Sequence, residues 1–204
     1  MTDDSPVPSS AGPTMNAMTE SGVMKHRLTV DEYYRMAEVG LLAPDARVEL
    51  IDGEIIDMPP MGSPHGGTGM FLIQRFTKAV DELAIVTAGS TLILGQYSAP
   101  QPDLMLLRPR SDFYRQSNPK PEDVLLVLEI SDSTWRYDRE IKAPLYAQHD
   151  VSDFWIVDLR KQELHCFRGP RRGEFSEVVT LTNPGFVAVQ SLGNVPVDLK
   201  GLFD

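Results

Sequence analysis

The stretch Val124-Leu125-Leu126-Val127-Leu128-Glu129-Ile130 decides the fold of this chain. It is apolar on both faces, which is typical of a strand buried in the middle of a sheet. Glu129 is the exception, and a carboxylate in such a strand is costly unless an opposite charge meets it. We therefore expect Glu129 to have a charged partner, either in a structural ion pair or in a functional site.

A second carboxylate stands just before the preceding apolar segment. Asp103 follows Pro102 and precedes Leu104–Leu107, which predicts a neighbouring strand. Two carboxylates held together at the ends of adjacent strands repel, and a divalent cation with oxygen ligands relieves that repulsion. Asp103 and Glu129 therefore predict a metal site, with an ordinary turn aspartate as the alternative for Asp103.

The segments upstream of this pair predict a helix and a hairpin. Thr29 can cap a helix that runs to about Glu38. The apolar segments Arg47–Ile51 and Glu54–Met58 flank Asp52-Gly53, the dipeptide that favours a two-residue hairpin turn.

A longer helix is predicted next, with Ser63 as its N-cap and Pro64 in its first position. It runs to about Leu83, and its apolar positions form one broad stripe. The stripe consists of Met70, Phe71, Ile73, Phe76, Val80 and Leu83. His65, in the first turn, is either a packed histidine or a phosphate contact at the helix N-terminus.

The rest of the chain predicts strands and one further helix. A helix from Ser133 or Thr134 to about His149 separates the Glu129 strand from Phe154–Val157, so these two strands should be parallel. Further strands are predicted near Ile85–Ala88, Thr91–Leu94, Glu163–Phe167, Phe175–Leu181 and Phe186–Val189. The predicted fold class is α/β, a mixed sheet flanked by helices.

Length and composition predict one globular domain behind a tail. The chain has 204 residues, of which 42% are hydrophobic and 24% charged, as in ordinary globular domains. Residues 1–25 are rich in Ser, Pro, Ala, Gly and Met and predict a disordered tail, which leaves residues 26–204 for the domain. No secretory signal or membrane-spanning run is present, so we expect a cytoplasmic protein. The single cysteine, Cys166, lies in an alternating strand pattern and should be packed.

The net charge of −10 argues against a large basic surface for nucleic acid. Basic residues nevertheless recur after both carboxylates, and they are equally consistent with scattered solvated charges. They are Arg108, Arg110, Arg115, Lys120, Arg136, Arg139 and Lys142.

A set of short segments, taken in order and with their spacing, resembles the Uma-two family of predicted restriction endonucleases. This family belongs to the restriction-endonuclease-like, PD-(D/E)xK nuclease superfamily. The segments are Glu49–Ile55, Met58-Pro59-Pro60, Ser63-Pro64-His65, Pro102-Asp103, Leu128–Ser131, Asp138 with Lys142 and Tyr146, and Phe154–Asp158. The resemblance implies a restriction-endonuclease-like fold and a Mg²⁺-dependent nuclease core, with Mn²⁺ as a substitute.

The resemblance also implies site residues. Asp103 matches the aspartate of the PD element, Glu129 the acidic residue of the second element, and Glu49 the upstream acidic residue, so these three would hold the metal. The second element should read Glu-x-Lys, but Ser131 stands where the lysine is expected. Lys142, on the following helix, resembles a displaced catalytic lysine.

Simpler explanations exist for several of these residues. Glu49 could be an exposed cross-strand partner in the hairpin. Asp138 and Lys142 are four residues apart, which also suits a helix-surface salt bridge. Tyr146, one turn further on, is better explained by packing.

Three functions follow from these observations. The first is a Mg²⁺-dependent endonuclease acting on DNA, for which cleavage of both strands would favour a homodimer. The second is a non-catalytic binding or scaffolding module of the same fold, favoured by the acidic charge and the missing Glu-x-Lys lysine. The third is a metal hydrolase acting on small phosphates, for which the sequence has no signature.

Overall fold

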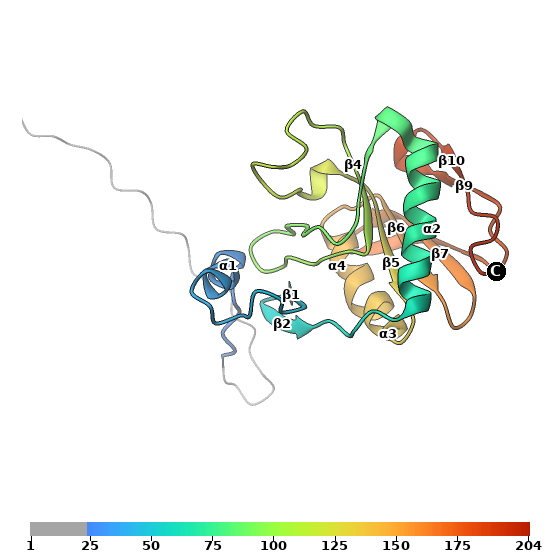
Figure 1. The fold of residues 1–204 in the computed structure, drawn as a ribbon. Coiled ribbons are helices and arrows are strands. Elements are labelled where there is room, and N and C mark those ends of the chain that lie inside the picture. The colour runs from blue at the N-terminus through green and yellow to red at the C-terminus, as the bar shows by residue number, and fades with distance from the viewer. Residues whose placement is uncertain (1–23) are drawn as a thin grey trace, which may run out of the picture.

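The computed structural model describes residues 24–204 (Figure 1), so the predicted disordered tail falls, except for Met24 and Lys25, outside the described residues. A six-stranded sheet forms the centre of the fold, in the order β3-β4-β5-β6-β7-β8. The strands are β3 (Ile85–Thr87), β4 (Leu104–Leu107), β5 (Val124–Ser131), β6 (Asp153–Asp158), β7 (Glu163–Arg171) and β8 (Glu174–Leu181).

The sheet is mixed, as predicted. Strands β5 and β6 are parallel, whereas every other neighbouring pair is antiparallel. The parallel pair confirms the strand–helix–strand crossover expected from the sequence. All eight residues of β5 are buried, as expected for a central strand with both faces covered.

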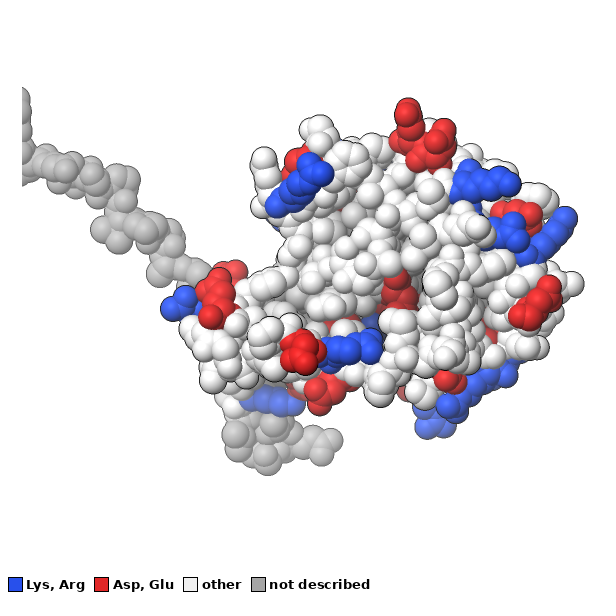
Figure 2. Space-filling model, in the orientation of Figure 1, with Lys and Arg blue, Asp and Glu red and all other residues white. Residues whose placement is uncertain are grey.

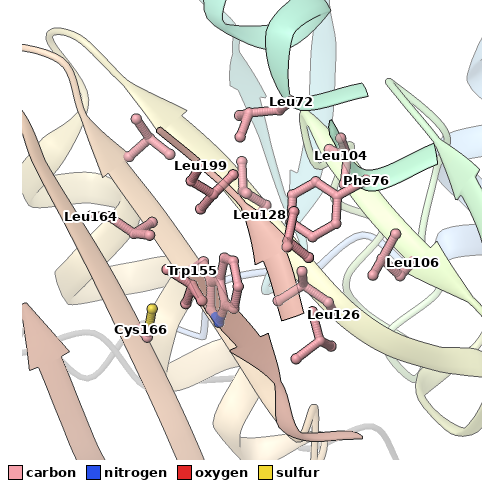
Figure 3. Packing of buried hydrophobic residues seen from close by; sticks show 14 of the residues in the cluster. Leu72, Phe76, Leu104, Leu106, Leu126, Leu128, Trp155, Leu164, Cys166 and Leu199 are labelled. Carbon is pink, nitrogen blue, oxygen red and sulfur yellow. The ribbon is translucent and has the colours of Figure 1, made fainter. Parts of the chain in front are cut away.

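One face of the sheet packs against the long helix α2 (Ser63–Val80). Alternate residues of the strands point to this face, and Figure 3 shows Phe76 of α2 close to leucines of β4 and β5. The helix contributes Leu72, Phe76 and Val80, each fully buried and four residues from the next. This spacing places all three on one side of the helix.

The predicted apolar stripe of α2 is confirmed only in part: Phe76 and Val80 are buried, but other members of the stripe are not. Met70 is 70% exposed and Leu83 57% exposed, whereas Leu72 has no exposed surface. The helix has apolar residues around much of its circumference, so the pattern alone does not select the buried side. The start is also shifted by one residue, because Gly62 is the N-cap and Ser63 is already helical. Beyond Val80 the helix tightens into a 3₁₀ turn, η1 (Asp81–Leu83).

The opposite face of the sheet is covered by a broken helix. It begins as α3 (Trp135–Tyr137), widens into a π-helical turn, η3 (Asp138–Lys142), and ends as α4 (Ala143–Gln148). Pro144 explains the wide turn, because its ring has no N–H and clashes with the carbonyl four residues earlier in a regular α-helix. The sequence predicted one continuous helix here, so the π-helical turn is a correction.

A small layer at the N-terminal end holds Glu49. Helix α1 (Val30–Glu38) has a capping box formed by Thr29 and Glu32. The hairpin strands β1 (Val48–Ile51) and β2 (Glu54–Asp57) pair across Asp52 and Gly53, whose φ angles of 51° and 81° confirm the predicted tight turn.

One strand prediction is wrong, and one strand of the structure was not predicted. Residues Thr91–Leu94 form no named strand; Leu92 and Leu94 are buried, and their amides bond to the carbonyls of Pro100 and Ser98. Prolines in the facing segment lack the N–H that a ladder requires. In the C-terminal region, β9 (Phe186–Val189) pairs with an unpredicted strand, β10 (Val195–Asp198), which contains Pro196.

The remaining turns are 3₁₀ segments, η2 (Pro121–Asp123) and η4 (Gln190–Leu192). Among residues 24–204, none of the helices combines the length and the apolar character that a membrane span requires. Cys166 is buried in β7, as expected, and burial raises the pKa of its thiol to about 12.

Candidate active site

A cavity of about 310 Å³ opens where the hairpin, the start of α2, the end of β5 and the α3–η3 segment meet. Figure 2 shows acidic and basic side chains inside a hollow on this face, beside α2. Glu49, Asp103, Glu129 and Lys142 all line this cavity. The fold therefore brings together the four site residues that were predicted from the sequence, although they come from separate elements.

The Lys142 ammonium lies between two buried carboxylates. Its Nζ is 3.0 Å from Glu129 Oε1 and 3.2 Å from Glu49 Oε2. The side chains of all three residues are at most 7% exposed. The π-helical turn carries Lys142 on the side of the helix that faces β5, so the lysine projects over the sheet and not into solvent.

Each of the two glutamates has additional partners. The Tyr146 hydroxyl donates to Glu129 Oε1 at 2.8 Å, the oxygen that Lys142 also contacts. The Gln101 amide donates to Glu49 Oε2 at 3.2 Å, and the Tyr137 hydroxyl donates to Glu49 Oε1 at 3.4 Å. These bonds hold both carboxylates in one orientation, and Glu129 keeps Oε2 without a hydrogen bond from any described residue.

Asp103 is held at the edge of the same cavity. Its Oδ2 accepts a hydrogen bond from the Ile130 amide at 2.7 Å, which ties the start of β4 to the end of β5. His65 Nε2, from the first turn of α2, lies 3.1 Å from the same oxygen. Oδ1 of Asp103 takes no hydrogen bond from the described residues and is available to a ligand.

The electrostatics of the cavity favour the protonated forms of Glu129 and Lys142. Burial raises the pKa of Glu129, and the Lys142 ammonium offsets this only in part. Burial alone would lower the pKa of Lys142, but Glu129, Glu49 and Asp138 together raise it. Lys142 is therefore charged at neutral pH, because three carboxylates stabilise its ammonium.

His65 and Asp138 add to this charge balance. The hydrogen bond to Asp103 raises the pKa of His65, although burial works in the opposite direction. Burial raises the pKa of Asp138, which also accepts a hydrogen bond of 2.7 Å from the Thr134 hydroxyl. In total, six carboxyl groups line the cavity, together with one lysine, one arginine and one histidine.

The simpler explanations for two residues do not match the geometry. Glu49 is 2% exposed and faces Lys142, so it is no exposed cross-strand partner in the hairpin. Lys142 is buried, and its ion pairs are with Glu49 and Glu129, so it forms no helix-surface salt bridge with Asp138. Ser131, at the position expected for lysine, is itself buried and 3.3 Å from the Thr134 hydroxyl.

The carboxylates do not form one tight cluster around an empty centre. Among residues 24–204, a group of three donor atoms within 4.8 Å of one another occurs at a different place, at Asp158, Glu163 and His165. The ammonium of Lys142 separates Glu49 from Glu129 in the cavity. Asp103 and Glu129 are therefore the carboxylates with an oxygen left for a ligand, while both oxygens of Glu49 have hydrogen-bonding partners.

The sequence alone does not place three residues of the cavity wall in the site. His65 was identified at the helix start, but its partner Asp103 is 38 residues away in sequence and could not be inferred from local spacing. Tyr137, at the end of α3, and Asp138, at the start of η3, also line the cavity. Of the basic residues that follow the two carboxylates, Lys142 alone lines the wall, joined there by Arg47 from the hairpin side.

Comparisons with known proteins agree with this architecture. The family Uma2, described as "Putative restriction endonuclease", matches residues 30–198. A solved structure, described as "a putative nuclease belonging to DUF820" from Anabaena variabilis, shares the fold with a TM-score of 0.66 and 18% sequence identity. The similarity covers 86% of this chain and 97% of that one. No curated protein matches the sequence significantly.

Proposed function

Because the chain belongs to the Uma2 family of "putative restriction endonucleases", we propose that it is a divalent-metal-dependent endonuclease that hydrolyses phosphodiester bonds of DNA. The observation that carries the proposal is the buried Lys142 ammonium, which bridges Glu129 and Glu49 in a cavity that Asp103 also lines. Residues 26–204 would form the nuclease domain, and the cytoplasm would be its location.

The residues present fit a hard divalent ion such as Mg²⁺, or Mn²⁺ in its place. Asp103 Oδ1 and Glu129 Oε2 are carboxylate oxygens that no described hydrogen bond occupies, and Mg²⁺ prefers such oxygen ligands. Glu49 supplies the third carboxylate of the set and anchors Lys142 at the same time. When bound, the ion would neutralise phosphate charge and lower the pKa of the attacking water.

The protein groups would have separate tasks in hydrolysis. The Lys142 ammonium, fixed by two carboxylates, would stabilise the negative charge that develops on the phosphate and orient the attacking water. His65 would act as a positioning residue, since its contact with Asp103 Oδ2 leaves the other oxygen directed at the ligand. Tyr146 would hold Glu129 in the corresponding orientation.

The acidic net charge bears on how the substrate binds. With a net charge of −10 the chain as a whole repels DNA, so binding would depend on local contacts between basic side chains and phosphates. Salt screens such contacts, so cleavage should be strongest at low ionic strength. Cleavage of both strands needs two cavities facing one duplex, and a homodimer is the assembly that we propose for that case.

A cleavage assay tests the proposal. Plasmid, single-stranded DNA and RNA are incubated with the full chain in Mg²⁺ or Mn²⁺ at low ionic strength, and the products are separated on gels. DNA cleavage should require the metal and should be lost in Asp103→Asn. Glu82→Gln, an exposed change outside the cavity, is the matched control. Folded wild-type protein that cuts no nucleic acid under these conditions would overturn the proposal.

One observation favours the alternative of a non-catalytic binding module. Lys142 already forms ion pairs with both Glu49 and Glu129 without any added ion, so the protein itself supplies a counter-charge to these two carboxylates. A binding module would retain DNA in a gel-shift experiment without cutting it, and its affinity would not depend on divalent metal.

A further inference from the structure

Asp158, Glu163 and His165 form a compact cluster away from the cavity. One ligand atom from each lies within 4.8 Å of the others. They come from the end of β6 and the start of β7, and they share the sheet face that the α3–α4 segment covers. None of the three lines the active-site cavity, so the cluster is a separate feature of the fold.

The cluster contains an uncompensated pair of like charges. Asp158 and Glu163 are directly opposite each other in the antiparallel register of β6 and β7. Like charges at opposed positions destabilise a strand pair. No side-chain nitrogen of a lysine or arginine among residues 24–204 lies within 4.0 Å of either carboxylate, and Asp158 is 2% exposed.

His165 directs a buried nitrogen at these carboxylates. The residue is 7% exposed, and its Nε2 has no hydrogen-bond partner of acceptable geometry among the described residues. That nitrogen lies 3.2 Å from Glu163 Oε2. The charges facing the ring are Glu163, Asp158, Lys161 and Arg139, and the ring of Trp135 packs on it at 4.4 Å between centroids.

The other ring nitrogen is oriented by the sheet. His165 Nδ1 is 2.9 Å from the Thr180 hydroxyl of β8. If Nδ1–H donates to that hydroxyl, Nε2 carries the free lone pair on the side of the ring where the two carboxylates lie, and metal-binding histidines are oriented in this way by a hydrogen bond to the other nitrogen. Burial lowers the pKa of His165, so its imidazole is neutral at pH 7, as a ligand must be.

We propose that Asp158, Glu163 and His165 form a second metal site, which takes a divalent transition-metal ion such as Zn²⁺. One imidazole with two carboxylates is a ligand set that suits Zn²⁺ better than Mg²⁺, which prefers oxygen ligands alone. The ion would compensate the opposed carboxylates and connect the ends of β6 and β7. Asp158 Oδ1 already accepts the amides of Arg160 and Lys161 at 3.0 Å each, so one ligand is positioned in advance.

Calorimetry with Zn²⁺ on the metal-free full chain tests the site. Glu163→Gln should weaken one Zn²⁺ equivalent by roughly tenfold or more, since losing a ligand costs at least as much as losing an outer-shell partner. That equivalent should be retained in Asp103→Asn. Glu174→Gln, an exposed change elsewhere in the same six-stranded sheet, is the matched control and should bind as wild type does.

The outcomes separate this inference from the proposed nuclease function. If folded Glu163→Gln binds Zn²⁺ with wild-type stoichiometry and affinity, the second site is overturned whatever the nuclease assay shows. If the only Zn²⁺ equivalent disappears in Asp103→Asn, the active-site cavity binds the metal and the second site is again overturned.

A second measurement does not depend on substitutions in the cluster. The ring of Trp135 packs against that of His165, so Co²⁺ bound at the cluster should quench the fluorescence of Trp135. The titration is made in the Asp103→Asn background, which removes the cavity site, and Trp135→Phe should abolish the quenching. Unchanged tryptophan emission at saturating Co²⁺ would overturn the proposal.

Discussion

His65 Nε2 lies 3.1 Å from Asp103 Oδ2, and this contact joins the first turn of α2 to the start of β4. The same oxygen accepts the Ile130 amide of β5. One carboxylate oxygen therefore connects three elements, and the other is left for a ligand. This contact supports the proposal that His65 positions Asp103, a role that the place of His65 in the sequence does not indicate.

Replacing His65 with Asn should weaken Mg²⁺ or Mn²⁺ binding by roughly 10- to 100-fold, the usual cost of losing a partner that orients a metal ligand. Calorimetry at fixed pH measures the change. The exposed His26→Asn variant is the control and should bind normally. Equal affinities in His65→Asn and wild type would show that Asp103 needs no help from the histidine.

Glu129→Gln and Asp103→Ala should each abolish measurable Mg²⁺ binding and leave the fold intact. Relief of carboxylate repulsion offsets part of the lost contacts. Titration calorimetry reports the binding, and far-UV circular dichroism checks the fold. Binding that survives in both variants would place the metal elsewhere.

Lys142→Met should lower turnover by about 10²-fold or more, because a preorganised cation is lost from the transition state. It should also cost roughly 3–5 kcal/mol of stability, since Glu49 and Glu129 stay buried without their counter-charge. Single-turnover cleavage and urea unfolding measure the two effects. The exposed Lys78→Met should change neither, and a Lys142→Met variant with wild-type turnover would contradict the displaced-lysine proposal.

Metal affinity should rise with pH. Burial raises the pKa of Glu129, so the unbound cavity keeps a proton at a pH where an exposed glutamate has lost it. A bound metal requires the ionised carboxylate, and binding therefore releases protons. The unbound state is favoured as the pH falls. Calorimetry in buffers with different ionisation enthalpies counts the protons, and a count of zero across the neutral range would contradict this prediction.

Leu72→Ala should destabilise the protein by about 2–5 kcal/mol, because it opens a cavity where α2 meets the sheet. Met70→Ala, two residues away on the same helix, should stay within about 0.5 kcal/mol, since Met70 is 70% exposed. Urea unfolding measures both. Equal losses of stability in the two variants would mean that a different side of α2 packs against the sheet.

The polar residues of the site could be predicted from sequence where they contrast with their surroundings. Glu129 stands in an apolar run, and Asp103 directly precedes one, so both were identifiable as exceptional. The parallel pairing of β5 and β6 followed from the helix between them. Lys142 was found through the family resemblance, but its burial depends on the π-helical turn, which the sequence reasoning did not anticipate.

Other features depend on tertiary contacts that no local pattern contains. Met70, Ile73 and Leu72 are all apolar, so only the docked sheet decides which of them is buried. The Thr91–Leu94 segment has strand-like residues, but its amides bond to a proline-containing segment and not to the sheet. The partnership of His65 with Asp103 likewise exists only in the folded chain.

Because Lys142 lies on the broken helix and not on β5, the ion pairs in the active-site cavity depend on the packing of the α3–α4 segment against the sheet. In the Glu-x-Lys arrangement, acid and cation share a strand and stay adjacent for as long as that strand exists. Here they are neighbours only while the α3–α4 segment rests on the sheet, so local opening of this segment would separate the charges without unfolding the sheet. The catalytic competence of the molecule would then follow the stability of a single short helical segment, a quantity that hydrogen exchange measures residue by residue.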